Sequence, residues 1–289
     1  MHHIFPPCAA LSPAARRFFE RSGDAKREMV DLSQAGVNAL RLKNSQAAAS
    51  GCQAVQAELG SRVEDGEMGG VSVEWITPHQ VDGPEVVLYL FGGAFVCGSP
   101  EDDVSISARL AHHLGRRVCA PRYRLAPEHP FPAARDDAMA VYRALTAADS
   151  RVILCGESAG GNLALGLVIG IAEADLAPPL SVALLSPWID LSHSGDSHTA
   201  LDGLDPTLSV ELFLSPASQA SARERTLHGF PLPSADLPLT FHCPRPSTAF
   251  HRRTLESTRP PRRPFHRSSP LYLRTCRPLS SQAPHATCS

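Results

Sequence analysis

The stretch VILCGESAGGNLALGLVIG, residues 152–170, decides the fold of this chain. Its first four residues predict a buried strand, its glycines predict a tight turn around Ser158, and the apolar run that follows predicts a buried helix over 159–172. The same alternation extends outward in both directions. Further strands are predicted at 71–76, 86–90, 117–120 and 182–185, with helices at 106–114 and 132–145. Nearly continuous apolar strands that alternate with helices indicate an α/β fold with a mostly parallel, doubly wound sheet covered on both faces.

The predicted turn, Gly156-Glu157-Ser158-Ala159-Gly160, has the pattern G-x-S-x-G between a strand and a helix. This arrangement is typical of a nucleophile elbow, which holds a serine in a strained backbone conformation. The helix that begins there directs its positive end toward any anion that develops at the serine, and the Ala159 amide is a candidate donor to it. The alternative is a glycine-rich turn that only links the two elements. The flanking strand and helix favour the nucleophile.

A second loop of small residues, Phe91-Gly92-Gly93-Ala94-Phe95, directly follows the predicted strand at 86–90. A loop in this place can bring backbone N–H groups to the same anion. A simple turn that ends the strand is the alternative interpretation.

Residues 86–215 resemble the hormone-sensitive-lipase family of α/β-hydrolases, which includes bacterial carboxylesterases. Five landmarks carry the resemblance in the family's order: FGGAFVCGS (91–99), YRLAPEHPFPAARDDA (123–138), GESAGGNLA (156–164), LLSPWIDLS (184–192) and DPTLSVELF (205–213). They cover nearly half of the chain.

The resemblance implies a serine hydrolase of carboxylic esters that works through an acyl-enzyme. Ser158 matches the nucleophile, and Gly93, Ala94 and Ala159 match the oxyanion-hole positions, which act through backbone N–H groups. Short or medium acyl esters are the implied small-molecule substrates, and no cofactor or metal is implied. Helices over about 10–60 resemble the cap that covers the family's acyl pocket.

Within the second landmark, the resemblance implies an architectural role for the acidic residues Glu128, Asp136 and Asp137. The 91–95 loop departs from the family, which has histidine where this chain has Phe91 and glycine where it has Ala94. Alanine keeps its N–H but lacks the torsional freedom of glycine. A misplaced oxyanion donor costs about 10²–10³ in rate.

The rest of the catalytic triad has no evident counterpart. In this fold the acid and then the histidine follow the serine along the chain. Residues 269–272 (SPLY) resemble the segment ahead of the family's acid-bearing strand, but the seventeen residues after them contain no carboxylate. Asp190 is an alternative acid, since some hydrolases place it after the preceding strand. Five later histidines are available, and none lies in a recognisable strand-loop context: His228, His242, His251, His266 and His285. The triad acid and histidine therefore remain unassigned.

Three regions follow from these patterns: an N-terminal helical cap region (1–65), an α/β-hydrolase core (66–215) and a tail (216–289). Between Pro231 and Ser289 there are eleven prolines, nine arginines and two acidic residues. Prolines at this density break helices and sheet ladders, so we expect a disordered or poorly packed tail that cannot contribute several strands. Three functional hypotheses remain: an esterase, a non-catalytic member that binds a ligand, or an inactive product whose C-terminal strands were replaced by a reading-frame change.

The composition of the chain argues against nucleic-acid binding, a membrane span and a zinc site. A formal net charge of −2 gives no field that would attract nucleic acid or an anionic membrane. No apolar stretch reaches the length of a membrane span, and the N-terminus lacks a signal-peptide pattern, so a cytoplasmic protein is expected. The eight cysteines form no C-x-x-C pair and no zinc-spaced cluster with histidine. The oligomeric state cannot be predicted from the sequence.

Overall fold

The computed structural model describes residues 33–191 throughout, together with 12–14, 16–17, 31, 195–196 and the backbone of 239–241. Predictions for the five later histidines, for residues 205–213 and for residues 269–272 lie outside the described residues.

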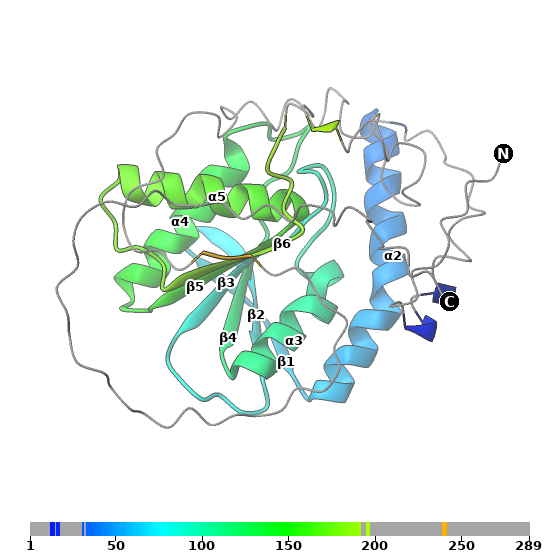
Figure 1. Cartoon of the computed structure of the whole chain (residues 1–289). Coiled ribbons are helices and arrows are strands. Elements are labelled where there is room, and N and C mark those ends of the chain that lie inside the picture. The colour runs from blue at the N-terminus through cyan, green and yellow to red at the C-terminus, as the bar shows by residue number, and fades with distance from the viewer. Residues whose placement is uncertain are drawn as a thin grey trace, which may run out of the picture. The chain divides into compact units, whose positions relative to one another are not determined.

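Within the described residues the sheet has seven strands, in the order β1-β2-β4-β3-β5-β6-β7. Strands β4, β3, β5, β6 and β7 run parallel, whereas β2 is antiparallel to both of its neighbours (Figure 1). The mostly parallel sheet is thus confirmed. The bounds are β1 Arg62–Met68, β2 Val71–Thr77, β3 Val86–Leu90, β4 Arg117–Pro121, β5 Val152–Glu157, β6 Ser181–Leu185 and β7 Leu239–Phe241.

Helices cover both faces of the sheet, as the apolar strands predict. Helices α4 and α5 lie on one face, and α3 lies on the other face with α2 packed beside it (Figure 1). The bounds are α2 Gln34–Leu59, α3 Val104–Leu114, α4 Ala133–Ala147 and α5 Ser158–Glu173, with a 3-10 turn, η1, at Glu101–Asp103.

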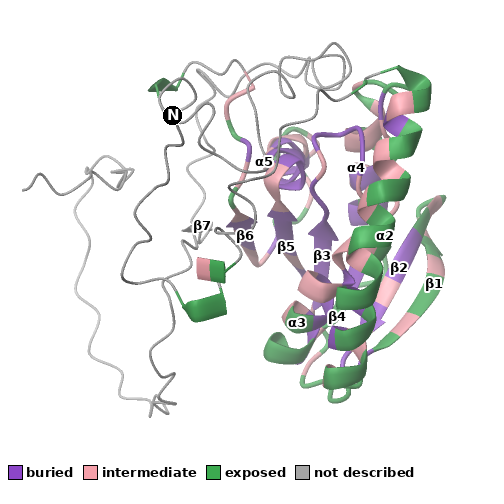
Figure 2. Cartoon of the chain, turned by 90° about the vertical axis from the view of Figure 1, so that its right-hand side faces the viewer, coloured by how far each residue is buried: buried purple, intermediate pink, exposed green. Residues whose placement is uncertain are grey.

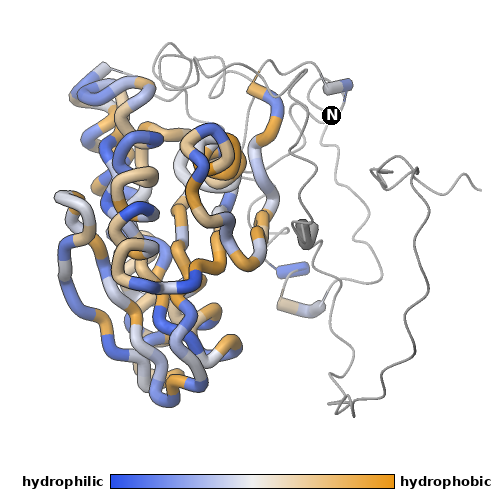
Figure 3. Tube along the Cα trace, turned by 90° about the vertical axis from the view of Figure 1, so that its left-hand side faces the viewer, coloured by the Kyte–Doolittle hydropathy of each residue, from blue (hydrophilic) through white to orange (hydrophobic). Residues whose placement is uncertain are grey.

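The core lies between the sheet and these helices. All five residues of β3 are buried, and most of α5 is buried as well. Figure 2 shows the buried central strands behind a largely exposed α2, and Figure 3 shows hydrophobic residues along the central strands and α5. None of the helices in the described ranges has the length and apolarity that crossing a lipid bilayer demands.

Helix α2 lies within residues 10–60, where the family resemblance implies helices. It begins after Ser33, whose hydroxyl accepts a hydrogen bond from the Gly36 amide at 3.2 Å. It ends at Gly60, which adopts a left-handed conformation with φ of 61°. Glycine is favoured at this position because a side chain would be strained there.

Strand β1 corrects the helical prediction for residues 1–65, because it begins at Arg62. Its sequence, RVEDGEM, is polar and carries no strong strand signal. Its pairing with β2 is antiparallel, from Arg62 opposite Thr77 to Met68 opposite Val71. Tertiary pairing along this edge therefore overrides the weak local preference.

Strand β7 comes from the segment predicted to be a tail. Three residues, Leu239–Phe241, pair in parallel with β6 between Pro238 and Pro244 of the sequence. One strand this short is compatible with the proline spacing, since none of the three residues is a proline. Nothing else of residues 216–289 is described.

Candidate active site

Ser158 lies at the junction of β5 and α5, as predicted. Its φ is 51°, a left-handed value that is uncommon for a residue other than glycine. Such a residue stores about 1–3 kcal/mol of strain and persists only where the surrounding structure holds it. Ser158 is half-buried, neither enclosed in the core nor fully exposed.

Two glycines allow this bend because backbone atoms pass close to them. A Cβ on Gly156 would collide with the Gly160 carbonyl, and a Cβ on Gly160 would collide with the carbonyls of Leu90 and Phe91. The elbow therefore packs directly against the end of β3, where the 91–95 loop begins.

The 91–95 loop faces Ser158. A Cβ built on Gly92 would lie 3.1 Å from the Ser158 Cβ, so the two residues are in close contact. The next three residues all have positive φ: 115° at Gly93, 54° at Ala94 and 61° at Phe95. Ala94 thus adopts the left-handed conformation despite its Cβ, at the strain cost that glycine would avoid.

A tight turn orients the amides of this loop. The Gly93 carbonyl accepts the amides of Val96 at 3.0 Å and Cys97 at 2.9 Å. Within the described ranges, the amides of Gly93 and Ala94 donate to no partner. The first amides of α5, including that of Ala159, have no acceptor within the helix. The structure therefore places the loop that contains Gly93 and Ala94 beside the turn of Ser158 and Ala159, with Gly92 in contact with the serine.

Buried side chains support the start of the loop. Phe91 stacks on Tyr123 with ring centroids 4.0 Å apart, and the Tyr123 hydroxyl donates to the Phe91 carbonyl at 2.6 Å. Phe91, which replaces the family's histidine, therefore packs against another buried aromatic ring. Asp103 accepts the Tyr89 hydroxyl at 2.8 Å and the Gly92 amide. Burial raises the pKa of Asp103, although both hydrogen bonds oppose the shift.

Glu157 is a site residue that the sequence interpretation missed. Its carboxylate lies against Gly92, where a Cβ would collide with it. Burial and the charge of Asp103 raise the pKa of Glu157 to about 7. The carboxyl group next to the elbow therefore changes charge near neutral pH. Its position, directly before the serine at the end of a buried strand, is the signal that could have found it.

The segment after β6 completes the surroundings of the elbow. The Trp188 amide donates to the Ser158 carbonyl at 2.9 Å, and Asn162 donates to the Trp188 carbonyl at 3.0 Å. Phe95 of the 91–95 loop lies near Trp188, with the two ring centroids 6.4 Å apart. The motif LLSPWIDLS is thus fixed to the helix that carries the serine.

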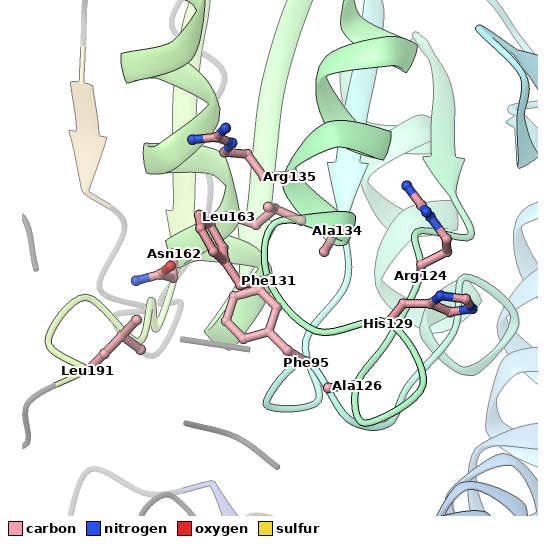
Figure 4. A pocket seen from close by; sticks show the side chains of 10 residues that line it. All are labelled: Phe95, Arg124, Ala126, His129, Phe131, Ala134, Arg135, Asn162, Leu163 and Leu191. Atoms are coloured by element: carbon pink, nitrogen blue, oxygen red, sulfur yellow. The ribbon is translucent and has the colours of Figure 1, made fainter. Parts of the chain in front are cut away.

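A pocket lies beside the elbow, lined by the side chains shown in Figure 4. Its apolar walls include Phe95 and Phe131, and Asn162 belongs to the first turns of α5. Ser158 itself does not line this pocket. The pocket is therefore adjacent to the serine and shares the 91–95 loop and α5 with it.

The acidic residues of the 123–138 segment engage arginines. Asp137 accepts the backbone amide of Arg124 at 2.8 Å and its guanidinium at 2.7–3.0 Å. Glu128 binds Arg41 of α2 at 2.7 and 2.9 Å. The exposed Asp136 lies 3.8 Å from Arg135. These contacts agree with the architectural role predicted for the segment.

Among residues 33–191 the structure places no general base within hydrogen-bond distance of the Ser158 hydroxyl. The Ser158 hydroxyl has no hydrogen-bond partner within residues 33–191. Asp190, the alternative acid, is half-buried after β6 and already has an interaction partner. The structure describes no group of three or more His, Cys, Asp or Glu side chains arranged to hold a metal ion.

The chain is similar to known esterases. Residues 87–230 match a protein-family model whose description is alpha/beta hydrolase fold. An acetyl-hydrolase of Streptomyces hygroscopicus is 37% identical over 165 residues, which cover 56% of this chain and 53% of that protein. An esterase of Acinetobacter venetianus is 33% identical over 135 residues, covering 46% and 45% of the two chains. The chain thus spans about half the length of these relatives.

Solved structures show the same likeness. An esterase from the bacterial hormone-sensitive lipase family superposes with a TM-score of 0.64 at 29% identity, over 76% of this chain and 72% of that one. A hormone-sensitive lipase from a metagenome library gives a TM-score of 0.63 at 27% identity, over 74% and 70% of the two chains.

Proposed function

Residues 87–230 belong to the alpha/beta hydrolase fold family, and from this premise we propose that the chain is a carboxylic ester hydrolase with Ser158 as its nucleophile. The observation that carries the proposal is the contact between the strained Ser158 and the 91–95 loop. The names of the relatives, acetyl-hydrolase and esterase, support an ester as the substrate.

In the proposed reaction, the Ser158 Oγ attacks the ester carbonyl carbon. The carbonyl oxygen becomes an oxyanion that accepts hydrogen bonds from the amides of Gly93, Ala94 and Ala159. Each such donor contributes about 10²–10³ in rate because it is already oriented before the charge develops. The N-terminus of α5 adds a positive partial charge at the same point. The alcohol then leaves, and water hydrolyses the acyl-enzyme.

This cycle requires a base that takes the serine proton and returns it to the leaving alcohol. Within residues 33–191 no base is hydrogen-bonded to the Ser158 hydroxyl. We therefore expect the base for turnover to come from another part of the chain. Loss of the triad histidine costs on the order of 10⁶ in turnover. Turnover therefore tests whether the histidine-containing segment after residue 196 completes the site.

Esters of short or medium acyl chains are the proposed substrates, as the resemblance to the hormone-sensitive-lipase family implies. The pocket beside the elbow has apolar walls at Phe95 and Phe131 and charged walls at Arg124 and Arg135. An aliphatic group gains about 0.8 kcal/mol for each methylene that it buries. We therefore expect affinity to rise from acetyl to butyryl esters.

The test combines a fluorophosphonate probe with p-nitrophenyl acetate and butyrate, using Ser158→Ala as the control. Labelling and hydrolysis that both require Ser158 support the esterase. Hydrolysis that persists in Ser158→Ala refutes the assignment of the nucleophile.

A non-catalytic ligand-binding protein is the second candidate, because Ser158 has no hydrogen-bonded base within residues 33–191. Folded protein that binds butyrate or a butyryl ester, with neither labelling nor hydrolysis, would favour this candidate. Calorimetric titration and fluorophosphonate labelling of the same preparation distinguish the two functions.

A further inference from the structure

Arg41 of helix α2 joins three separate segments of the chain. Its Nε donates to the Val96 carbonyl at 2.8 Å. Its Nη2 donates to the Ala126 carbonyl at 2.9 Å. Nη1 and Nη2 also bind the two Glu128 oxygens at 2.7 and 2.9 Å. The planar guanidinium thus satisfies a bidentate carboxylate and two carbonyls at once, which a lysine ammonium cannot do with the same geometry.

Val96 connects Arg41 to the candidate oxyanion loop, residues 91–95. The Val96 amide donates to the Gly93 carbonyl at 3.0 Å, so Arg41 holds the residue that closes the turn around Gly93. A second residue of α2, Asn44, donates to the Cys97 thiol at 3.6 Å. That thiol in turn lies 3.2 Å from the Gly93 carbonyl. Helix α2 therefore contacts the loop at two successive residues.

Different parts of the molecule hold the two halves of this loop. The first half is attached to the core, through Tyr123 at Phe91 and Asp103 at Gly92. The second half is attached to α2 through the Val96 carbonyl and the Cys97 thiol, which directly follow the 91–95 loop, and to the 123–138 segment through the Ala126 amide, which donates to the Phe95 carbonyl at 2.9 Å. Movement of α2 away from the core would remove its contacts with Val96 and Cys97 while leaving those of the first half in place.

The Glu128 carboxylate stays charged over the ordinary pH range. The hydrogen bond from Arg41 lowers the pKa of Glu128 to about 2. Both side chains are partly shielded, with 26% and 34% of their surfaces exposed. The attachment of α2 is therefore persistent rather than titratable near neutral pH.

We propose that Arg41 is a positioning residue, which couples the seating of helix α2 to the order of the loop that carries the Gly93 and Ala94 amides. This inference rests on the proposed function, because it assigns those amides to the oxyanion. It predicts that a seated α2 and an ordered oxyanion loop occur together.

The test compares Arg41→Ala and Arg41→Lys with a matched control, Arg109→Ala. Arg109 also attaches α2, through Glu58 at 3.5 Å, but contacts neither end of the loop. The measurements are kcat and KM for p-nitrophenyl butyrate, and hydrogen exchange of peptides that cover residues 91–99. We expect roughly a 10- to 100-fold fall in kcat for Arg41→Ala, less than the 10²–10³ of a lost oxyanion donor because the loop keeps its other attachments, and a change in KM below about threefold.

Exchange in residues 91–99 should rise in Arg41→Ala while the strands keep their protection. Arg41→Lys should restore only part of kcat, since lysine lacks the planar fork. Arg109→Ala should stay within about twofold of the wild type in both measurements. Should Arg41→Ala fail to fold, Glu128→Gln, which keeps the bond to Val96, should show a smaller change in the same direction.

Unchanged kcat and unchanged exchange in a folded Arg41→Ala protein would overturn the proposal. Exchange that rises equally across the whole sheet would also overturn it, since the role would then be general stability. If the wild type hydrolyses no ester, the proposed function fails, yet the exchange measurement still decides whether Arg41 orders the loop.

Discussion

Glu74 offers a direct test of the buried electrostatics of this fold. It lies on β2, where only 3% of it is exposed, and its Oε1 has no hydrogen-bond partner among the described residues. Its Oε2 is 3.7 Å from the Arg122 guanidinium, which also binds Asp65 and Glu101. Burial and the charge of Glu101 raise the pKa of Glu74 from 4.5 to about 7, although Arg122 opposes the shift.

The raised pKa sets the sign and size of the effect on stability. In the unfolded chain Glu74 releases its proton near its ordinary value, whereas the folded protein keeps it up to pH 7. Between these values the folded state binds more protons, so the free energy of unfolding falls as pH rises. The free energy of unfolding falls by about 3 kcal/mol in total. About 1 kcal/mol of this fall has occurred by pH 5, and the fall is complete above pH 7.

The substitution Glu74→Gln removes this dependence because glutamine stays neutral. Between pH 5 and pH 8 we expect the free energy of unfolding of the variant to rise by about 2 kcal/mol relative to that of the wild type. The comparison across pH cancels the difference in packing between the two side chains. Urea unfolding followed by circular dichroism at both pH values gives the free energies of unfolding.

The matched control is Glu173→Gln, which removes the same charge from an exposed position at the end of α5. This control should show the same pH dependence as the wild type. The reasoning is refuted if Glu74→Gln and the wild type keep a constant difference from pH 5 to pH 8. A gain of similar size in Glu173→Gln would trace the effect to net charge instead of burial.

Two further predictions concern the site. Gly92→Ala should lower kcat up to about 10²-fold, because its Cβ would displace the Glu157 carboxylate and lie 3.1 Å from the Ser158 Cβ, which crowds the loop against the serine. Steady-state hydrolysis measures the fall, and Gly51→Ala, whose Cβ enters open space, should leave kcat unchanged. Glu157→Gln should raise kcat relative to the wild type more at pH 8.5 than at pH 6, because the carboxyl with a pKa of about 7 gains a charge that repels the oxyanion. Parallel pH–rate profiles for the two proteins would contradict this repulsion.

Much of the fold could be predicted because its signals are local. The strand over 86–90 and the helix over 106–114 follow from apolar runs and spacing, and the structure places β3 and α3 there. Strand β1 could not be predicted, because its polar residues acquire strand geometry only by pairing with β2. Its pattern alone is equally compatible with an exposed helix.

The candidate site divides in the same way. Ser158 and its two glycines are recognisable from sequence, because a strand, a sharp turn and a helix leave a short and specific pattern. Arg41 and Glu157 are not, because a charged residue on a helix or beside a turn is usually solvated. Their roles depend on Val96, Glu128 and Gly92, which are far away in the chain and meet them only after folding.

The sequence by itself therefore determined the elbow, the strand–helix alternation and the α/β-hydrolase fold, since each depends on neighbouring residues. Only the tertiary structure decided that Ser158 touches the 91–95 loop, that Arg41 of α2 binds the Val96 carbonyl at the end of that loop, and that burial raises the pKa of Glu157 to about 7. The physical reason is that contact, burial and pKa are properties of segments brought together across the sheet, and no local pattern encodes them.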